Sequence, residues 1–373
     1  MLLDARRASV TITPFEPRMS GAVRAFNRRL KASGVPYQFP EASVPAWLPP
    51  HPGRRTFQRY YLAVEDGETV RGGYILKWQD FFVGGRTTPV GYVHLPLSEG
   101  LIDRKYGALG VQLIMHACKQ APLLFALGIG SMDEPLARML KALKWPVRTV
   151  PFYFRVLRPF TVARGLTYLR KTTPRRIALE LAAHSGAAWL ALRVLQGNSR
   201  PGTDAIEEVE RFDSWADEVW LGAREAYRFV GCRDAETLNL LFPGDGRFIR
   251  LKVSARGVAI GWVVLRDTPM RGHKYFGDLR VGSIVDCFSR PEDARRVVGA
   301  GLRWLEGREV DLVVSNQTAN AWCEALRYHG FLSGPSTFIF AASRPLHDEL
   351  QPFAASFGHA HMTRSDGDGP INL

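Results

Sequence analysis

The stretch RGGYIL at residues 71–76 has a diverged counterpart, RGVAIG, at residues 256–261. The dipeptide Arg-Pro at residues 158–159 likewise recurs at residues 344–345, and each time we expect an aromatic-rich strand before it. The offset between matching features is nearly constant at roughly 186 residues, which predicts two diverged copies of one α/β unit. We expect either one ligand site in each copy, or one working copy and one that has lost its site.

The first copy is expected to begin with an amphipathic helix, because Val23, Phe26 and Leu30 recur at helical spacing. Alternating and buried apolar runs then predict strands and two further helices. The expected elements, in order, are a helix, three strands, a helix, a buried strand and a helix, at residues 22–33, 60–64, 74–78, 90–97, 111–120, 123–128 and 134–143.

The fold class predicted from these elements is α/β, with α+β layering and two tandem mixed-sheet domains. The expected boundaries are 1–160 for the first domain and 204–345 for the second, which is the more degenerate copy. A basic, helical connector is expected at 161–203 and a tail at 346–373.

Composition favours a globular protein, since 373 residues with 46% hydrophobic and 23% charged side chains can bury two cores. The four cysteines have no spacing that would hold zinc, and they predict buried thiols in a reducing compartment. The first residues lack the apolar core of a signal peptide. We therefore expect a cytoplasmic protein.

The net charge of +13 is concentrated, because residues 135–179 contain many arginines and lysines and no acid. This window is either a solvated basic face or a surface for an anionic partner such as a membrane, an anionic cofactor or polymer, or RNA. Residues 177–195 are too polar to span a bilayer and predict either a linker helix or an interfacial helix. One hypothesis is therefore that residues 135–195 contact the inner face of a membrane peripherally. Nucleic acid is a less favoured partner.

Three segments resemble motifs of the GNAT superfamily of acyl-CoA-dependent acyltransferases, in a tandem arrangement over nearly the whole chain. They are IDRKYGALGVQ at residues 102–112, which precedes a helix, the segment 131–145, and its better match at 315–331. Two further segments, RDAETLN at 233–239 and MTRSD at 362–366, are similar to elements of GNAT-like proteins associated with bacterial exopolysaccharide synthesis.

The resemblance implies acyl-CoA, acetyl-CoA above all, as co-substrate. Backbone N–H groups at a helix N-terminus form a donor set for pyrophosphate, and glycines let the ligand approach. The implied cofactor-binding residues are those of this donor loop and of the strand before it, namely Leu95, Leu97, Gly107, Ala108, Leu109, Gly110, Val111 and Gln112. Alternatively, Gly107 and Gly110 only permit a tight turn, or the motif starts at Arg104 with Leu109 in the small position.

The second copy departs further from the motif. Its corresponding stretch, residues 284–294, contains no glycine, and Glu292 and Asp293 would repel a phosphate. We expect this copy to shape the acceptor site or to stabilise the core.

Acyl transfer to an amine needs a base for the ammonium proton and an acid for the leaving thiolate. The tyrosine that often supplies the acid in the family is replaced by leucine in both copies. Glu99, after the strand at 90–97, is the expected base, and Tyr106 is the expected substitute acid. His94 and Tyr328 are further substitutes. No metal is expected, because Asp366 and Asp368 are too few ligands for a calcium loop.

Three hypotheses follow. The first is an N-acyltransferase, in particular an acetyltransferase, that acts on a cell-envelope or polysaccharide precursor and transfers groups other than aminoacyl groups. The second is an aminoacyl-tRNA-dependent transferase similar to peptidoglycan-branching enzymes, which the basic window would suit. The third is a non-catalytic scaffold of a polysaccharide assembly system. Calorimetric titration with acyl-CoA separates the first from the other two.

Overall fold

The structure is a computed structural model that describes residues 10–42, 44–45, 48–128, 130–165, 202–273 and 275–367. Most of the expected connector, and the helix expected at 177–195, lie outside the described residues. The chain divides into two compact units. Unit 1 consists of Met1–Phe81, Thr87–Arg148 and Ile339–Glu349, and unit 2 of Phe82–Arg86, Thr149–Phe338 and Leu350–Leu373.

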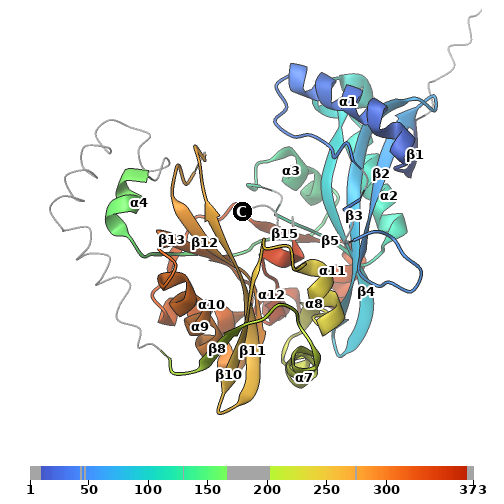
Figure 1. The fold of residues 1–373 in the computed structure, drawn as a ribbon. Coiled ribbons are helices and arrows are strands. Elements are labelled where there is room, and N and C mark those ends of the chain that lie inside the picture. Colours follow the sequence, from blue (N-terminus) through green and yellow to red (C-terminus); the bar gives the residue numbers. More distant parts are fainter. Residues whose placement is uncertain are drawn as a thin grey trace, which may run out of the picture. The chain divides into compact units, whose positions relative to one another are not determined.

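The first sheet has the strand order β1-β2-β3-β4-β5-β15-β6 (Figure 1). Neighbouring strands run antiparallel from β1 to β3 and again between β5 and β15, whereas β4 and β5 are parallel. Its strands are β1 (Val10–Pro14), β2 (Phe57–Glu65), β3 (Thr69–Val83), β4 (Arg86–Ser98), β5 (Leu124–Leu127), β15 (Ile339–Ala342) and β6 (Val147–Thr149).

Helices cover both faces of this sheet. On one face, α1 (Ser20–Ala32) buries Val23, Phe26 and Leu30, whose spacing of three and four residues forms one apolar stripe. On the other face, α2 (Leu109–Gln120) and α3 (Pro135–Ala142) pack against Tyr74 and Leu76 of β3. Short 3₁₀ turns η1 (Pro17–Met19), η2 (Glu99–Leu101) and η3 (Arg104–Tyr106) connect these elements, and α11 (Arg344–Glu349) follows β15.

The second sheet has the order β8-β10-β11-β12-β13-β7-β14. Its strands are β8 (Ala205–Glu208), β10 (Ile249–Ala255), β11 (Val258–Pro269), β12 (Arg280–Ser289), β13 (Leu312–Asn316), β7 (Phe152–Val156) and β14 (Leu332–Gly334). The remaining elements of unit 2 are α4 (Pro159–Gly165), α7 (Ser214–Ala223), η5 (Arg224–Ala226), β9 (Phe229–Gly231), α8 (Ala235–Leu241), η6 (Pro291–Asp293), α9 (Ala294–Glu306), α10 (Asn320–Tyr328), α12 (Phe353–Phe357), β16 (Ala360–His361) and η7 (Arg364–Asp366).

The two sheets follow the same order of elements, with one exchange. The strand next to last in each sheet comes from the other half of the sequence: β15 lies between β5 and β6, and β7 lies between β13 and β14. The compact units are therefore not the contiguous ranges 1–160 and 204–345 that we expected from the sequence. Residues 82–86, at the turn between β3 and β4, also group with unit 2, where Gly84 donates to the carbonyl of Arg228 at 3.1 Å.

The segment expected to be a tail is largely folded. From residue 346 to residue 367 it contains the end of α11, all of α12, β16 and η7, and β16 pairs in parallel with β9. Asp366 is only 1% exposed and caps η7 together with Thr363. Asp366 therefore belongs to the buried interior of unit 2.

Candidate functional site

Two neighbouring strands of unit 1 separate after a short parallel ladder. β4 and β5 pair at Gly91 with Leu124 and at Tyr92 with Phe125, and no later pair forms among the described residues. β4 nevertheless continues to Ser98. The stretch of β4 beyond Tyr92 therefore presents main-chain N–H and C=O groups that β5 does not satisfy.

A β-bulge at Leu95 accompanies this separation. Leu95 has a φ of 48°, which is a strained conformation for a leucine. The side chain of Val93 packs in the cluster under α2, whereas those of Leu95 and Leu97 pack in the cluster under α1. Residues two apart on a regular strand share one face, so the alternation shifts by one residue between Val93 and Leu95. Bulges of this kind bend a strand and change the direction in which its side chains point, and they are common beside active sites.

Tyr92 and His94 lie at the point of separation. The Tyr92 hydroxyl donates to the carbonyl oxygen of Leu127 on β5 at 3.0 Å, and its oxygen is 3.3 Å from Nδ1 of His94. The Tyr92 ring is buried and stacks on Phe125, whereas His94 is half-buried. The buried Tyr92 side chain thus contacts the His94 ring at the point where β4 and β5 separate.

The expected donor loop follows β4. Gly107 ends η3 with a φ of −56°, so its backbone conformation is one that any residue adopts. α2 begins at Leu109, and the first N–H groups of a helix have no partner within the helix. Ala108, Val111 and Gln112 are exposed around this end, as is Gly107, whereas Leu109 is buried in the core.

Gly100 and Gly110 show how closely this loop is packed. A Cβ atom on Gly100 would lie 2.5 Å from the carbonyl oxygen of Tyr106, so only glycine fits there. A Cβ atom on Gly110 would lie 3.5 Å from Sδ of Met139 and 3.7 Å from Oγ of Ser98, which are ordinary contacts. The glycine that the loop requires is therefore Gly100, which the motif comparison did not single out.

Glu99, the expected base, forms ion pairs that hold the start of this loop against α1 and β3. It is 3% exposed, and its two carboxylate oxygens accept hydrogen bonds from Arg29 of α1 and from Arg71 of β3, the latter at 2.8 Å. Both oxygens of this carboxylate are thus engaged by guanidinium groups of unit 1. The geometry therefore favours a positioning role for Glu99 over the role of general base.

Tyr106, the expected acid, belongs to the same network. Its hydroxyl donates to Glu65 of β2 at 2.9 Å, and Glu65 also accepts from Lys105 at 3.0 Å and from Arg71. The hydrogen bond from Lys105, followed by those from Tyr106 and Arg71, lowers the pKa of Glu65 to about 2 against the effect of desolvation. Arg71 links both acids, Glu65 and Glu99, so the network fixes the donor loop to the edge of the sheet.

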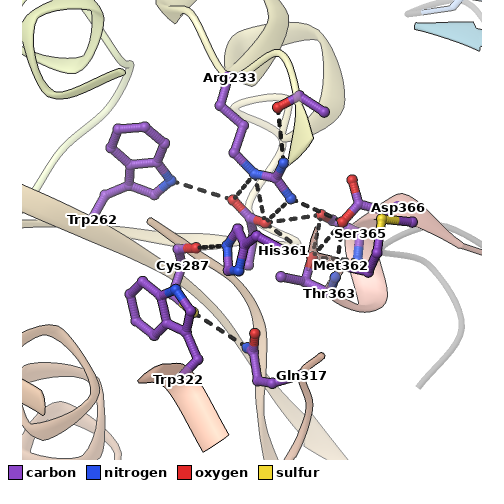
Figure 2. Close-up of polar contacts among 12 residues, drawn as sticks. Arg233, Trp262, Cys287, Gln317, Trp322, His361, Met362, Thr363, Ser365 and Asp366 are labelled. Carbon is purple, nitrogen blue, oxygen red and sulfur yellow. Dashed lines mark hydrogen bonds and ion pairs between the residues drawn. The ribbon is translucent and has the colours of Figure 1, made fainter. Parts of the chain in front are cut away.

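Unit 2 contains a second polar network, which is fully buried (Figure 2). Arg233 lies between the carboxylates of Asp286 on β12 and Asp366 in η7, at 2.8 Å and 2.9 Å. Asp286 also accepts hydrogen bonds from Thr363 and Ser365, each at 3.0 Å. Burial alone would raise the pKa of Asp286, but the charge and hydrogen bonds of Arg233 outweigh it and hold the pKa below its usual range.

This network joins the two segments, 233–239 and 362–366, that the sequence comparison had singled out. They lie far apart in the sequence, and Arg233 bonds directly to Asp366. The structure thus shows them to be parts of one buried cluster. Asp286, the third member of the cluster, lies in the stretch 284–294, for which the sequence analysis predicted no such ion pair.

β12 and β13 separate in unit 2 as β4 and β5 do in unit 1. They pair from Val281 with Leu312 to Ile284 with Ser315, and the register of β11 and β12 skips Val285, which marks a bulge. Here, however, the segment 358–363 bonds to β12 and to the loop that follows β13. His361 bonds the carbonyl of Cys287 on β12, and Thr318, after β13, bonds the carbonyl of Ala360 and the N–H of Met362.

Burial distinguishes the two diverging strands. Every residue of β12 from Val281 to Ser289 is buried, whereas His94, Leu95 and Pro96 of β4 are half-buried. The carbonyls of Cys287 and Ser289 on β12 accept hydrogen bonds from His361 and Tyr227. The stretch of β4 beyond Tyr92 is therefore more exposed than the corresponding stretch of β12.

The described residues were expected to hold no metal, and two negative findings concern metal ligands and membrane-spanning helices. No cluster of His, Cys, Asp and Glu side chains that could hold a metal ion occurs among the residues that the structure describes. Within the same residues, no helix has the length and apolar character needed to cross a bilayer. Of the basic window 135–179, only residues 135–165 are described.

The sequence matches no model of a known protein family, and no curated protein sequence matches it. Solved structures do match. A conserved protein of Enterococcus faecalis V583 described as a "Probable N-Acyltransferase" has 12% identity and a TM-score of 0.51, covering 92% of this chain and 74% of that one. N-myristoyltransferase of Saccharomyces cerevisiae with bound myristoyl-CoA has 12% identity and a TM-score of 0.53, covering 92% and 80%.

A GCN5-related N-acetyltransferase from Anabaena variabilis has 8% identity and a TM-score of 0.51, covering 89% of this chain and 72% of that one. At such low identity the likeness is one of fold. This chain has two mixed sheets, and each contains a parallel pair of strands, as the α/β class expected from the sequence implies. The chain has the mixed α/β fold of GNAT-like N-acyltransferases.

Proposed function

We propose that this chain is an acyl-CoA-dependent N-acyltransferase that binds its donor in unit 1. The observation that carries the proposal is the stretch of β4 beyond Tyr92, which β5 does not pair with and which leads to the exposed N-terminus of α2. The amide groups of a pantetheine arm can pair with such an edge as an added strand does. The pyrophosphate would then meet the N–H groups and the dipole of α2. Exposed Gly107, Ala108, Val111 and Gln112 surround that end.

The chemistry requires the acceptor nitrogen to form a bond to the thioester carbonyl carbon while the C–S bond breaks. One proton leaves the amine, and the thiolate takes up one proton. We assign the base to His94. Its Nδ1 lies 3.3 Å from the hydroxyl oxygen of Tyr92, which orients the imidazole at the point where the strands separate.

Unit 2 is proposed to have no donor site. Residues 358–363 bond β12 and the loop after β13 there, and the helix that follows β12, α9, is preceded by Glu292 and Asp293. Acids at this position repel a phosphate. One donor per chain is therefore expected.

The acceptor is proposed to be an amine on a cell-envelope or polysaccharide precursor. The support is the resemblance of segments 233–239 and 362–366 to GNAT-like proteins of exopolysaccharide synthesis. Aminoacyl-tRNA as a donor would rest on the basic window 135–179, whose later part lies outside the described residues. Scaffold and RNA-dependent functions are the outcomes that the following test separates from acyl transfer.

Calorimetric titration of the full-length protein with CoA and acetyl-CoA at moderate salt tests the proposal. We expect saturable binding with one ligand per chain. A folded sample that gives no heat with either ligand would refute the acyl-CoA proposal and turn the search to RNA or protein partners. Two ligands per chain would show that unit 2 also binds donor.

A further inference from the structure

Four aromatic rings pack together at the point where β4 and β5 separate. Phe125 of β5 lies at the centre of this group, 5.2 Å from the Tyr92 ring, 5.8 Å from Phe340 of β15 and 5.5 Å from Phe81 of β3. None of the four rings is more than 2% exposed. The strands therefore part above a packed aromatic floor within unit 1.

Tyr92 also ties the two strands together beyond their last pair. Its hydroxyl reaches the carbonyl of Leu127, two positions past Phe125 on β5. The Tyr92 side chain thus crosses the space into which the strands diverge. A group that lies along β4 from Ser98 toward Tyr92 would end at this side chain.

The length of β4 places the acyl group of a donor at this floor, if the proposed function holds. Ser98 lies beside Gly110 at the N-terminus of α2. From Ser98 back to Tyr92, a strand covers about 20 Å at 3.3 Å per residue. An extended pantetheine arm has a similar length. With the pyrophosphate at α2, the thioester carbonyl would reach Tyr92 and His94, and any longer acyl chain would have to continue into the rings.

We propose that Tyr92 limits the length of the acyl group, so that the donor is a short-chain acyl-CoA such as acetyl-CoA or propionyl-CoA. Protein interiors are close-packed, and inserting methylene groups among buried rings forces neighbours out of position. This inference rests on the proposed function and adds the substrate class to it.

The experiment compares binding of CoA, acetyl-CoA, butyryl-CoA, hexanoyl-CoA and decanoyl-CoA to the full-length protein and its variants. Wild type should bind acetyl-CoA at least as tightly as the longer esters. Tyr92→Phe keeps the ring and should keep this order. Tyr92→Leu and Tyr92→Ala remove ring volume and should improve binding of butyryl-CoA or hexanoyl-CoA relative to acetyl-CoA, by up to about 4-fold for each methylene accommodated.

A matched control is Tyr60→Leu, which removes a buried ring on the α1 side of the sheet. It should lower thermal stability without changing the order of the esters. If Tyr92→Ala fails to fold, the order of acyl-CoA affinities is measured on Tyr92→Leu instead.

Two results would overturn the inference. One is wild-type binding that tightens steadily up to decanoyl-CoA, and the other is an unchanged order of esters in folded Tyr92→Leu. In both cases acetyl-CoA and CoA still bind, so the proposed function survives. If folded wild type binds none of the esters and no CoA, the proposed function fails and this inference fails with it.

Discussion

Arg233 donates from both Nε and Nη2 to Asp286, at 2.8 to 3.2 Å, and both side chains are at most 1% exposed. Desolvating two such charges is costly, so the ion pair stabilises the fold chiefly by preventing either charge from being buried alone. The same guanidinium also donates to Asp366 and to the carbonyl of Gly231. The pair thereby connects β12, the loop before α8 and the C-terminal segment within unit 2.

Removing one partner of this pair should destabilise unit 2 strongly. Asp286→Ala leaves the Arg233 charge buried beside Asp366 alone, and we expect a loss of about 3 to 5 kcal/mol in the free energy of unfolding. The control is Asp245→Ala, which breaks the more exposed pair with Arg247 and should cost at most about 1 kcal/mol. Urea unfolding followed by tryptophan fluorescence measures both. Equal losses in the two variants would contradict the assignment.

The stability of unit 2 should also depend on pH through His361. Burial, followed by the charge of Arg233, lowers the pKa of this imidazole to about 4. Its Nε2–H donates to the carbonyl of Cys287, as a neutral ring does. Between pH 4 and about 6.5, the unfolded state binds a proton on this residue that the folded state does not, so stability should rise with pH.

The interval between the two pKa values corresponds to about 3 kcal/mol. His361→Gln retains an N–H donor but cannot titrate. Unfolding free energies measured from pH 4 to pH 7.5 should therefore rise by up to this amount more for wild type than for the variant. Parallel curves for the two proteins would show that His361 does not titrate as proposed.

Local periodicity predicted the helices and strands around the candidate site well. The helices expected at 22–33 and 111–120 form as Ser20–Ala32 and Leu109–Gln120, and the buried strand expected at 123–128 forms as Leu124–Leu127. Apolar side chains at helical spacing predict a helix, and a short continuous apolar run predicts a buried strand. Both patterns can be recognised from neighbouring residues alone. The mixed α/β fold class followed from their order.

Features that depend on distant residues could not be predicted in this way. The aromatic segments before the two Arg-Pro dipeptides predicted strands, but nothing local shows that β7 and β15 are exchanged between the sheets. Leu95 has no side-chain feature that favours a positive φ. Glu99 had the residue type of a base, and only the folded structure shows that Arg29 and Arg71 bind it.

The donor loop can be tested at Gly107, whose φ of −56° accommodates other residues. Gly107→Asp places a carboxylate just before α2, where it should favour the helix dipole and repel the pyrophosphate. We expect at least a tenfold weaker binding of acetyl-CoA by calorimetry. Gly107→Asn has the same shape without the charge and should bind nearly as wild type does. Equal weakening by both variants would indicate a steric effect, and no weakening would place the pyrophosphate elsewhere.

His94 should matter for turnover rather than for donor binding. Once an acceptor amine is found, His94→Gln should lower kcat by about 10²- to 10⁴-fold, the usual contribution of a general base, with little change in the Kd for acetyl-CoA. The matched variant is Glu99→Gln, which weakens the contacts with Arg29 and Arg71. It should lower the melting temperature and leave the pH profile of kcat unchanged in the folded enzyme. A base at Glu99 would reverse this pattern, with kcat lost in Glu99→Gln and retained in His94→Gln.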